Sequence, residues 1–136
     1  MVKDLISDML TRIRNASLAK HSFVNLQYSK QACDILKIFT KEGYIMGYTV
    51  EKSSHNFIKV YLKYKGSWIK TSFISQIIRI SKPGQRIYTS YRNFYKTIKY
   101  LKYNEGIGII STSNGVMNHF KAYYYKKGGE IICYIK

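Results

Sequence analysis

The sequence predicts an α+β fold built from two small lobes. Apolar residues at helical spacing are concentrated near the N-terminus, and alternating strand patterns dominate the rest of the chain. A length of 136 residues with 46% hydrophobic residues suits one compact unit or two small lobes with real cores. We therefore expect an N-terminal lobe of two helices on a small sheet at residues 1–70. A C-terminal β-rich lobe with a short helix should occupy residues 71–136.

Two amphipathic helices are predicted in the first lobe. The first should run from Asp4 to about Ala19, because five apolar residues fall on one helical face: Leu5, Ile6, Met9, Leu10 and Ile13. Asp8 and Arg12 are placed to form an ion pair one helical turn apart. The second helix should cover residues 30–42, with Ser29 as its N-cap and Gly43 able to end it.

Strands are predicted around and after the second helix. Residues 23–26 form a short strand candidate, and residues 44–51 and 57–64 form a hairpin around a turn at 52–56. Apolar residues in 57–64 alternate with basic and aromatic ones, so one sheet face should be apolar and the other exposed. The lobe boundary is expected within residues 65–76, where Trp68 and Phe73 are predicted to pack.

The second lobe contains short strands separated by turn residues. Strands are expected at 77–80 and 85–88, on either side of the turn Ser81-Lys82-Pro83-Gly84, with a second turn at 90–93. One helical turn is predicted within 94–102, resting on Ile98 and Leu101. A buried strand should cover 107–110, a short helix 116–124, and a last strand 130–135 that alternates around Ile131, Cys133 and Ile135.

A polar loop follows the buried strand at 107–110. Its sequence is Ser111-Thr112-Ser113-Asn114-Gly115. Serine, threonine and asparagine favour turns because their side chains bond nearby backbone groups. Gly115 can take a positive φ or let another chain approach the backbone. The loop thus presents several donors and acceptors from a rigid strand, which suits reading the edges of nucleotide bases.

The net charge of +16 predicts a polyanionic partner. Lysine and arginine number 23 against seven acidic residues, and the cations are spread over all segments. Nucleic acid is the first expectation and an anionic membrane surface the second. The chain has no apolar run near the ~20 residues of a membrane span. Heavy use of lysine, isoleucine and tyrosine is typical of A/T-rich genomes, which include those of organelles and some bacteria.

No metal site or catalytic centre is predicted. Cys33 and Cys133 lie in apolar patterns without a Cys-x-x-Cys pair, so we expect buried free thiols. His21, His55 and His119 have no metal-ligand spacing. Nucleotide-binding glycine loops and nucleophile motifs are missing, and the acidic residues are too few for a catalytic pair. We therefore expect a protein that is not an enzyme and uses no cofactor or small-molecule substrate.

Several blocks of the chain resemble the S8 family of small-subunit ribosomal proteins. The loop Ser111-Thr112-Ser113-x-Gly115-Val116-Met117 resembles that family's signature. The other blocks occur in the family's order: residues 4–16, Leu36 with 41–45, 79–88, and 128–134. Together they span nearly the whole chain, whereas residues 49–76 match only in pattern.

The resemblance implies a structural protein of the small ribosomal subunit. It implies binding to the central domain of the small-subunit ribosomal RNA, contact with neighbouring ribosomal proteins, and a role in early assembly. Base edges and sugars would be contacted by the polar loop, with Tyr88 next to the RNA and Glu130 holding loop amides or accepting from a base. Phosphates would be met by basic residues and by the polar side of the first helix: Lys82, Arg86, Lys30, Arg12, Arg14, Thr11 and Asn15.

Residues 119–127 depart from the family pattern. An acidic and arginine-rich helix usually follows Met117, but this chain has His119-Phe120-Lys121-Ala122-Tyr123-Tyr124-Tyr125-Lys126-Lys127. Such divergence favours a mitochondrial ribosome over a plastid one, with a bacterial cytoplasm as a further alternative.

A free-standing RNA-binding module, such as a translational repressor, is the alternative function. A peripheral membrane protein ranks third, because it would need one strongly amphipathic basic helix.

Overall fold

The chain folds into two compact α+β units, which confirms the predicted fold class. This computed structural model describes residues 4–52, 55–98, 101 and 105–136. The units are Met1–Ser75 and Gln76–Lys136. None of the described helices is long and apolar enough to cross a membrane.

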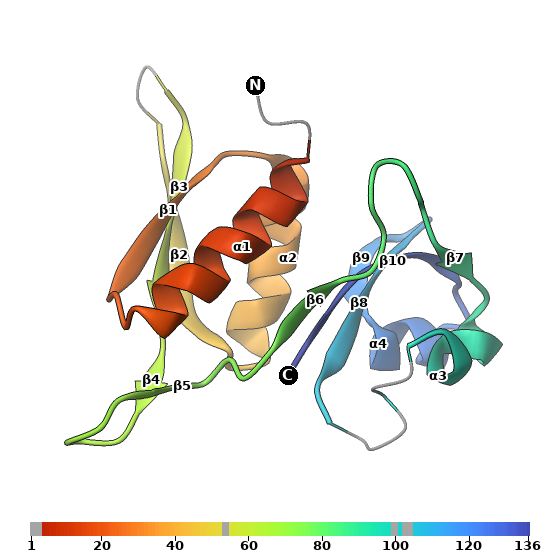
Figure 1. The fold of residues 1–136 in the computed structure, drawn as a ribbon. Coiled ribbons are helices and arrows are strands. Elements are labelled where there is room, and N and C mark those ends of the chain that lie inside the picture. The colour runs from red at the N-terminus through yellow and green to blue at the C-terminus, as the bar shows by residue number, and fades with distance from the viewer. Residues whose placement is uncertain (1–3, 53–54, 99–100, 102–104) are drawn as a thin grey trace. The chain divides into compact units, whose positions relative to one another are not determined.

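The first unit begins with the two predicted helices (Figure 1). In α1 (Leu5–Leu18), the Asp4 carboxylate accepts hydrogen bonds from the first-turn amides. In α2 (Lys30–Lys41), the Ser29 hydroxyl accepts from the Ala32 amide at 3.0 Å. Both caps satisfy backbone donors that the helix itself leaves unpaired.

The two helices cover one face of a three-stranded antiparallel sheet. Its strands are β1 (Phe23–Gln27), β2 (Ile45–Glu51) and β3 (Phe57–Leu62), in the order β1-β3-β2. Ile58 and Val60 are fully buried, as the predicted alternation requires. The expected turn at 52–56 lies partly outside the described residues.

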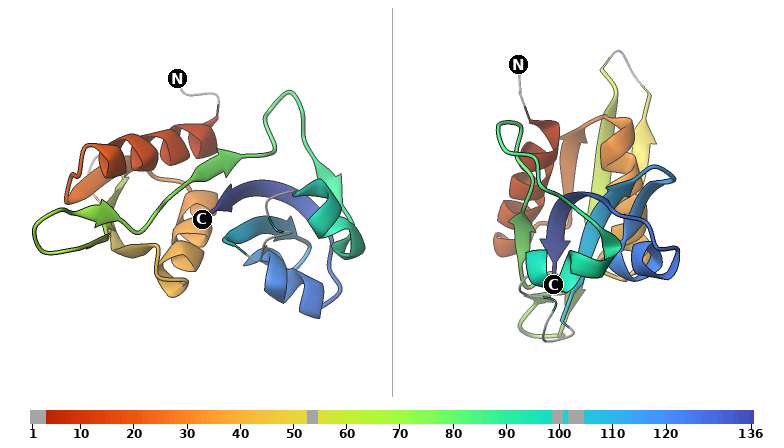
Figure 2. Two further views of the ribbon diagram at one scale, coloured as in Figure 1. Left: turned by 60° about the horizontal axis from the view of Figure 1, so that its bottom comes forward. Right: turned by 90° about the vertical axis from the view of Figure 1, so that its right-hand side faces the viewer.

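A two-stranded hairpin ends the first unit. Strand β4 (Tyr64–Lys65) pairs with β5 (Thr71–Ser72). The prediction that Trp68 packs is wrong, since Trp68 is 97% exposed. Its hairpin projects from the rest of the unit, as the left view of Figure 2 shows. Phe73 is only partly covered, with the Lys63 ammonium 4.5 Å from its ring centroid.

The second unit is built on one antiparallel sheet with a central C-terminal strand. Strands β6 (Ile77–Arg79), β10 (Gly129–Ile135), β8 (Ile107–Thr112) and β9 (Gly115–Asn118) lie in that order, and β7 (Tyr88–Thr89) also pairs with β10. Figure 1 shows β7 next to β10. The expected strand at 85–88 is thus reduced to a short strand that begins at its last residue.

The chain turns back after β8, so the helix expected at 116–124 begins later than predicted. Residues 116–118 belong to β9, and only His119–Tyr124 forms helix α4. The turn at Ser113 and Asn114 returns the chain alongside β8, where backbone pairing holds it as a strand. The Asn118 side chain then accepts from the Lys121 amide at 2.8 Å and starts the helix.

Strand β10 does not show the predicted simple alternation. Residues 131–135 are all buried, and the pairing with β8 shifts between Ile131 and Cys133. The extra residue, Ile132, forms a bulge that bends the strand. Side chains after the bulge point to the opposite face of the sheet from the one that simple alternation predicts. The bend of β10 is visible in both views of Figure 2.

Short helices cover one face of this sheet and close the core. They are the 3₁₀ turn η1 (Tyr91–Asn93), α3 (Phe94–Thr97) and α4. Residues 99–100 and 102–104 of the expected helical stretch lie outside the described part of the chain. The buried residues that pack together come from the helices and from the sheet: Phe94, Ile98, Leu101, Ile110, Met117, Ala122, Ile131 and Tyr134.

Candidate nucleic-acid interface

Three predicted site residues lie in one row across the sheet of the second unit. In the strand register, Glu130 of β10 is opposite both Tyr88 of β7 and Ser111 of β8. Side chains directly opposite in antiparallel strands point to the same face. The neighbouring pair Ile110 and Ile131 belongs to the core cluster, so the row faces away from the helices. Tyr88 is 68% exposed at one end of the row.

The predicted polar loop is the tight hairpin between β8 and β9. Thr112 pairs with Gly115, which leaves Ser113 and Asn114 at the tip. Gly115 takes a φ of +109°, and a Cβ there would meet nothing within 4 Å. The positive φ predicted for this glycine is thus present, and it closes the hairpin.

Thr112 holds the hairpin together. Its hydroxyl donates to the Gly115 carbonyl at 2.8 Å and accepts from the Asn114 amide at 3.2 Å. The loop amide of Asn114 is thus held by Thr112. Because a hydroxyl has a single proton to donate, Thr112 can meet a ligand only as an acceptor. Ser113 and Asn114 are exposed and remain able to donate and accept.

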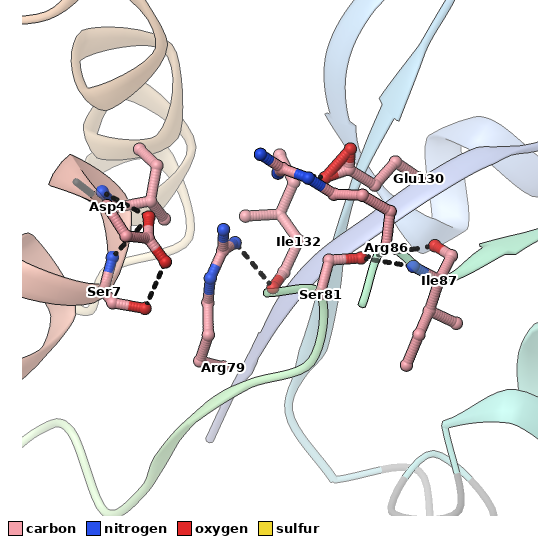
Figure 3. Close-up of polar contacts among 9 residues, drawn as sticks. Asp4, Ser7, Arg79, Ser81, Arg86, Ile87, Glu130 and Ile132 are labelled. Carbon is pink, nitrogen blue, oxygen red and sulfur yellow. Dashed lines mark hydrogen bonds and ion pairs between the residues drawn. The ribbon is translucent and has the colours of Figure 1, made fainter. Parts of the chain in front are cut away.

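Arg86 lies next to the row of site residues (Figure 3). Its guanidinium donates to the Glu130 carboxylate at 3.0 Å. An exposed pair of this kind adds only about 0–1 kcal/mol of stability, so its main effect is to orient both side chains. Arg86 keeps further N–H groups that can meet a phosphate. Lys82 is exposed on the same loop, in a turn closed by mutual bonds between Lys82 and Gln85.

Ser81 closes the loop that carries Lys82 and Arg86. Its side chain is fully buried, accepts from the Ile87 amide at 2.9 Å and donates to the Ile87 carbonyl at 3.3 Å. Figure 3 shows both bonds bridging the base of the loop. The sequence placed Ser81 in a turn but gave no sign of this clamp.

Replacing Ser81 by alanine should destabilise the second unit by about 1–3 kcal/mol, because the Ile87 amide loses its partner in a partly buried place. The free energy of unfolding from urea denaturation measures this effect. Ser113→Ala is the matched control, since that hydroxyl is exposed and its loss should change stability by less than about 0.5 kcal/mol. Equal stability of the two variants would contradict the clamp.

Gly128 and Gly129 let three segments meet beside the row. A Cβ on Gly129 would lie 2.0 Å from the Ser111 carbonyl oxygen, and one on Gly128 would lie 2.5 Å from the Thr89 carbonyl oxygen. The atoms met are backbone atoms, which cannot move aside as a side chain can. These glycines therefore permit the close pairing that brings Ser111, Glu130 and Tyr88 together.

His119 is a buried neutral histidine in the core of this unit. Its Nδ1 accepts from the Gly108 amide at 3.0 Å, and 1% of the residue is exposed. Burial lowers the pKa of His119 to about 4. The sequence had excluded His119 from a metal site but gave no reason to place it in the core.

The buried His119 should make folding stability depend on pH. An unfolded histidine titrates near 6.5, so between about pH 6.5 and 4 the unfolded chain binds the extra proton. The contribution of neutral His119 to the free energy of unfolding is complete above pH 6.5. It should fall by up to about 3 kcal/mol as the pH drops to 4. The test is to measure the free energy of unfolding in urea for the wild type and His119→Gln at several pH values. The acidic residues titrate in both proteins, so the difference between the two reports on this histidine. A difference independent of pH would contradict the account.

The remaining predicted contacts belong to the first unit. On α1, Thr11, Arg12 and Asn15 are exposed and Arg14 is half-buried, and the Arg12 guanidinium forms the predicted ion pair with Asp8 at 2.9 Å. Arg12 and Asn15 also line a groove of about 340 Å³ beside β1. Lys30 is exposed in the first turn of α2. The structure thus divides the predicted residues between two units.

The cysteines are free thiols, as expected, but they differ in burial. Cys133 is fully buried, which raises the pKa of its thiol to about 12. Cys33 is only partly buried, and burial raises the pKa of its thiol as well. Across the described residues, no group of three or more histidine, cysteine, aspartate or glutamate side chains is placed to hold a metal ion.

Comparison with known proteins identifies close relatives over the full length of the chain. The family model for ribosomal protein S8 matches residues 4–135. The chain is 43% identical over 136 residues to small ribosomal subunit protein uS8c of Gracilaria tenuistipitata var. liui, covering 99% of both chains. It is 46% identical over 134 residues to uS8 of Mesomycoplasma hyopneumoniae (strain 7448), covering 98% of this chain and 97% of that protein. Identity to uS8 of Dictyoglomus thermophilum is 43% over 135 residues, covering 98% of each.

Proposed function

This chain belongs to the ribosomal protein S8 family, and we propose that its second unit reads small-subunit ribosomal RNA through the Tyr88–Glu130–Ser111 row and the adjoining hairpin tip. The chain is a structural constituent of the small ribosomal subunit. The proposal adds binding in the central domain of the RNA, a role in early assembly, and contacts with neighbouring small-subunit proteins. The family is structural, and no catalytic role is proposed.

The single observation that carries the base-reading proposal is the alignment of the row. Three strands bring Ser111, Glu130 and Tyr88 to one solvent-facing line, and the Ser113–Asn114 tip extends it. Double-stranded RNA has a deep, narrow major groove, so specific recognition uses unpaired bases and the shallow minor groove. A rigid line of hydroxyl, carboxylate, amide and aromatic groups suits such splayed bases.

Phosphate contacts should be made by the cations around this line and by the first unit. Lys82 and Arg86 share the loop closed by Ser81, while Arg12, Arg14 and Lys30 belong to α1 and α2. Thr11 and Asn15 would add neutral hydrogen bonds from the same helix. Phosphate contacts fix the position of the RNA but carry no sequence information, so these residues should act on all RNAs alike.

The ribosome concerned is proposed to be that of an organelle, on the grounds of the A/T-biased composition. The relatives named above are a uS8c protein and two uS8 proteins of other organisms. They support a plastid or bacterial ribosome at least as well as a mitochondrial one. The preference for the mitochondrion, which the sequence drift in 119–127 suggested, stays a prediction.

The affinity of the purified chain for a central-domain fragment of small-subunit ribosomal RNA tests the proposal. A scrambled duplex of equal length at the same salt concentration is the control. We expect the fragment to bind at least about tenfold more tightly, because two or more base contacts contribute ~1 kcal/mol each. Equal affinity for both RNAs would refute base reading by this chain.

A further inference from the structure

A cluster of exposed tyrosines and cations lies in the same unit but outside the proposed row. We define the tyrosine cluster as Tyr91, Arg92, Tyr123, Tyr124 and Lys126. The Tyr91 and Tyr123 rings meet edge to face, with centroids 5.8 Å apart, so η1 and α4 are joined here. Tyr123 is 53% exposed and Tyr124 is 78% exposed. These large aromatic surfaces are therefore open to a ligand.

One cation of the cluster, Arg92, is held against a ring. The Arg92 side chain donates to the Tyr91 hydroxyl at 3.1 Å, and its guanidinium carbon lies 5.6 Å from the Tyr91 ring centroid. The hydrogen bond from Arg92, with a smaller effect of the Lys126 charge, lowers the pKa of Tyr91. Arg92 thus lies against the Tyr91 ring, and Lys126 adds a second positive charge nearby.

Charge complementarity indicates what this surface would bind. Glu105 and Glu130 are the only acidic residues in the sequence of the second unit, and they form ion pairs with Lys136 and Arg86. The segments that form the cluster, residues 88–98 and 118–129, contain no acidic residue. An anionic ligand is therefore favoured, and the exposed rings favour one that also carries flat, stackable groups.

The cluster lies close to the proposed base-reading row. Tyr88 belongs to that row, and Tyr91 follows three residues later, so their Cα atoms are at most about 11 Å apart. The chain leaving α4 passes directly against this segment, because a Cβ on Gly128 would lie 2.8 Å from the Ser90 Cα. Figure 1 shows α4 beside α3 at the same side of the sheet. The row itself faces away from the helices, so the cluster is a separate surface of the same unit.

We propose that the tyrosine cluster is a second RNA subsite that holds unpaired nucleotides. This inference rests on the proposed function and adds the class of RNA recognised outside the row. Bases stack on Tyr123 and Tyr124, while Arg92 and Lys126 meet phosphates. Stacking on aromatic rings accepts any base, so the subsite contributes affinity for single strands without sequence preference.

The backbone at Lys126 supplies a clean test variant. Lys126 has a φ of +55°, and the amides of Lys126 and Lys127 bond back to the carbonyls of Tyr123 and Ala122. Glycine is the usual residue at such a helix end. Lys126→Gly therefore removes the charge while favouring the native backbone, and its melting temperature should equal or exceed that of the wild type. Tyr124→Ala is equally suitable, because that ring is mostly exposed and alanine favours helix.

The experiment measures binding of a labelled oligoadenylate of about 12 nucleotides, a length within the site sizes of single-strand-binding proteins. A duplex RNA with the same number of phosphates is the second probe. Tyr124→Ala should weaken oligoadenylate binding by about 5- to 100-fold and leave duplex binding nearly unchanged. Lys126→Gly should weaken both probes. Tyr124→Phe, which keeps the ring, and Trp68→Ala, which removes an exposed ring from the first unit, should bind like the wild type.

Unchanged oligoadenylate binding by both Tyr124→Ala and Tyr123→Ala would overturn the proposal. Equal losses of oligoadenylate and duplex binding by the tyrosine-to-alanine variants would also overturn it, because the rings would then only support the fold. The proposal would also be overturned if these variants bound RNA normally but were poorly incorporated into small subunits. That result would assign the cluster to a protein neighbour. The ratio of affinities for the ribosomal RNA fragment and the scrambled duplex tests base reading in the row separately, so failure of the row can be distinguished from failure of this subsite.

Discussion

Raising the salt concentration from about 50 to about 200 mM is expected to weaken RNA binding by roughly 10³- to 10⁵-fold, if about six to ten phosphates are neutralised. The expectation follows from the net charge of +16, spread over both units. Each phosphate that meets a lysine or arginine releases bound counterions, and salt opposes that release. Binding isotherms at several salt concentrations give the slope of the logarithm of affinity against the logarithm of salt.

Single cation variants sharpen the salt experiment. Lys82→Ala should weaken binding to all RNAs alike. It should also reduce the slope of the logarithm of affinity against the logarithm of salt by the amount that about one phosphate contact contributes. Arg86→Ala should also weaken all RNAs, because it removes a cation and leaves the Glu130 carboxylate facing the RNA. An RNA affinity that does not respond to salt would contradict the electrostatic account.

Replacing Gly129 by alanine is expected to cost at least about 3 kcal/mol of stability and to abolish specific RNA binding. The new methyl group would lie 2.0 Å from the Ser111 carbonyl oxygen and 3.2 Å from the Thr112 Cα, so β10 and β8 must separate. Separation occurs where Glu130 faces Ser111, and the row loses its alignment. Urea denaturation and RNA binding are measured on the same preparation.

Two other glycines supply controls for this variant. Gly84 lies in an exposed turn, and a Cβ there would meet nothing within 4 Å, so Gly84→Ala should change stability by less than about 0.5 kcal/mol. Gly115→Ala also meets no atom, but its φ of +109° should cost about 1–3 kcal/mol through backbone strain alone. If Gly129→Ala were as stable as Gly84→Ala, close packing of β10 against β8 would not support the site.

Periodicity predicted the first unit well, because its elements are long and separately encoded. The predicted Ser29 cap of the second helix is formed in the structure, and Asp4, predicted as the start of the first helix, is its N-cap. The exposed Trp68 could not be predicted, since its hydrophobicity says nothing about whether a neighbouring surface exists to cover it. Trp68 lies in the loop between the two-residue strands β4 and β5, and this hairpin projects from the rest of the unit.

The second unit was predicted less accurately, because its short strands depend on pairing between distant segments. Residues 116–118 have no strong strand pattern and become a strand through the hairpin with β8. The fully buried Ser81 clamp and the Gly129 contact depend on backbone positions that no local pattern encodes. The polar loop was predicted because its turn residues and its preceding buried strand are adjacent in sequence. The tyrosine cluster appeared only when η1 and α4 came together.

The ratio of affinities for the ribosomal RNA fragment and the scrambled duplex, compared between the wild type and Ser113→Ala, tests base reading most directly. Ser113 lies at the tip of a hairpin fixed by Thr112 and Gly115, so the backbone that carries its exposed hydroxyl is positioned before RNA binds. Losing one interfacial hydrogen bond costs ~1–3 kcal/mol, and phosphate contacts are unaffected. The ratio should therefore fall by about 5- to 150-fold, while duplex affinity stays constant. An equal loss of affinity for both RNAs would contradict base reading by this loop.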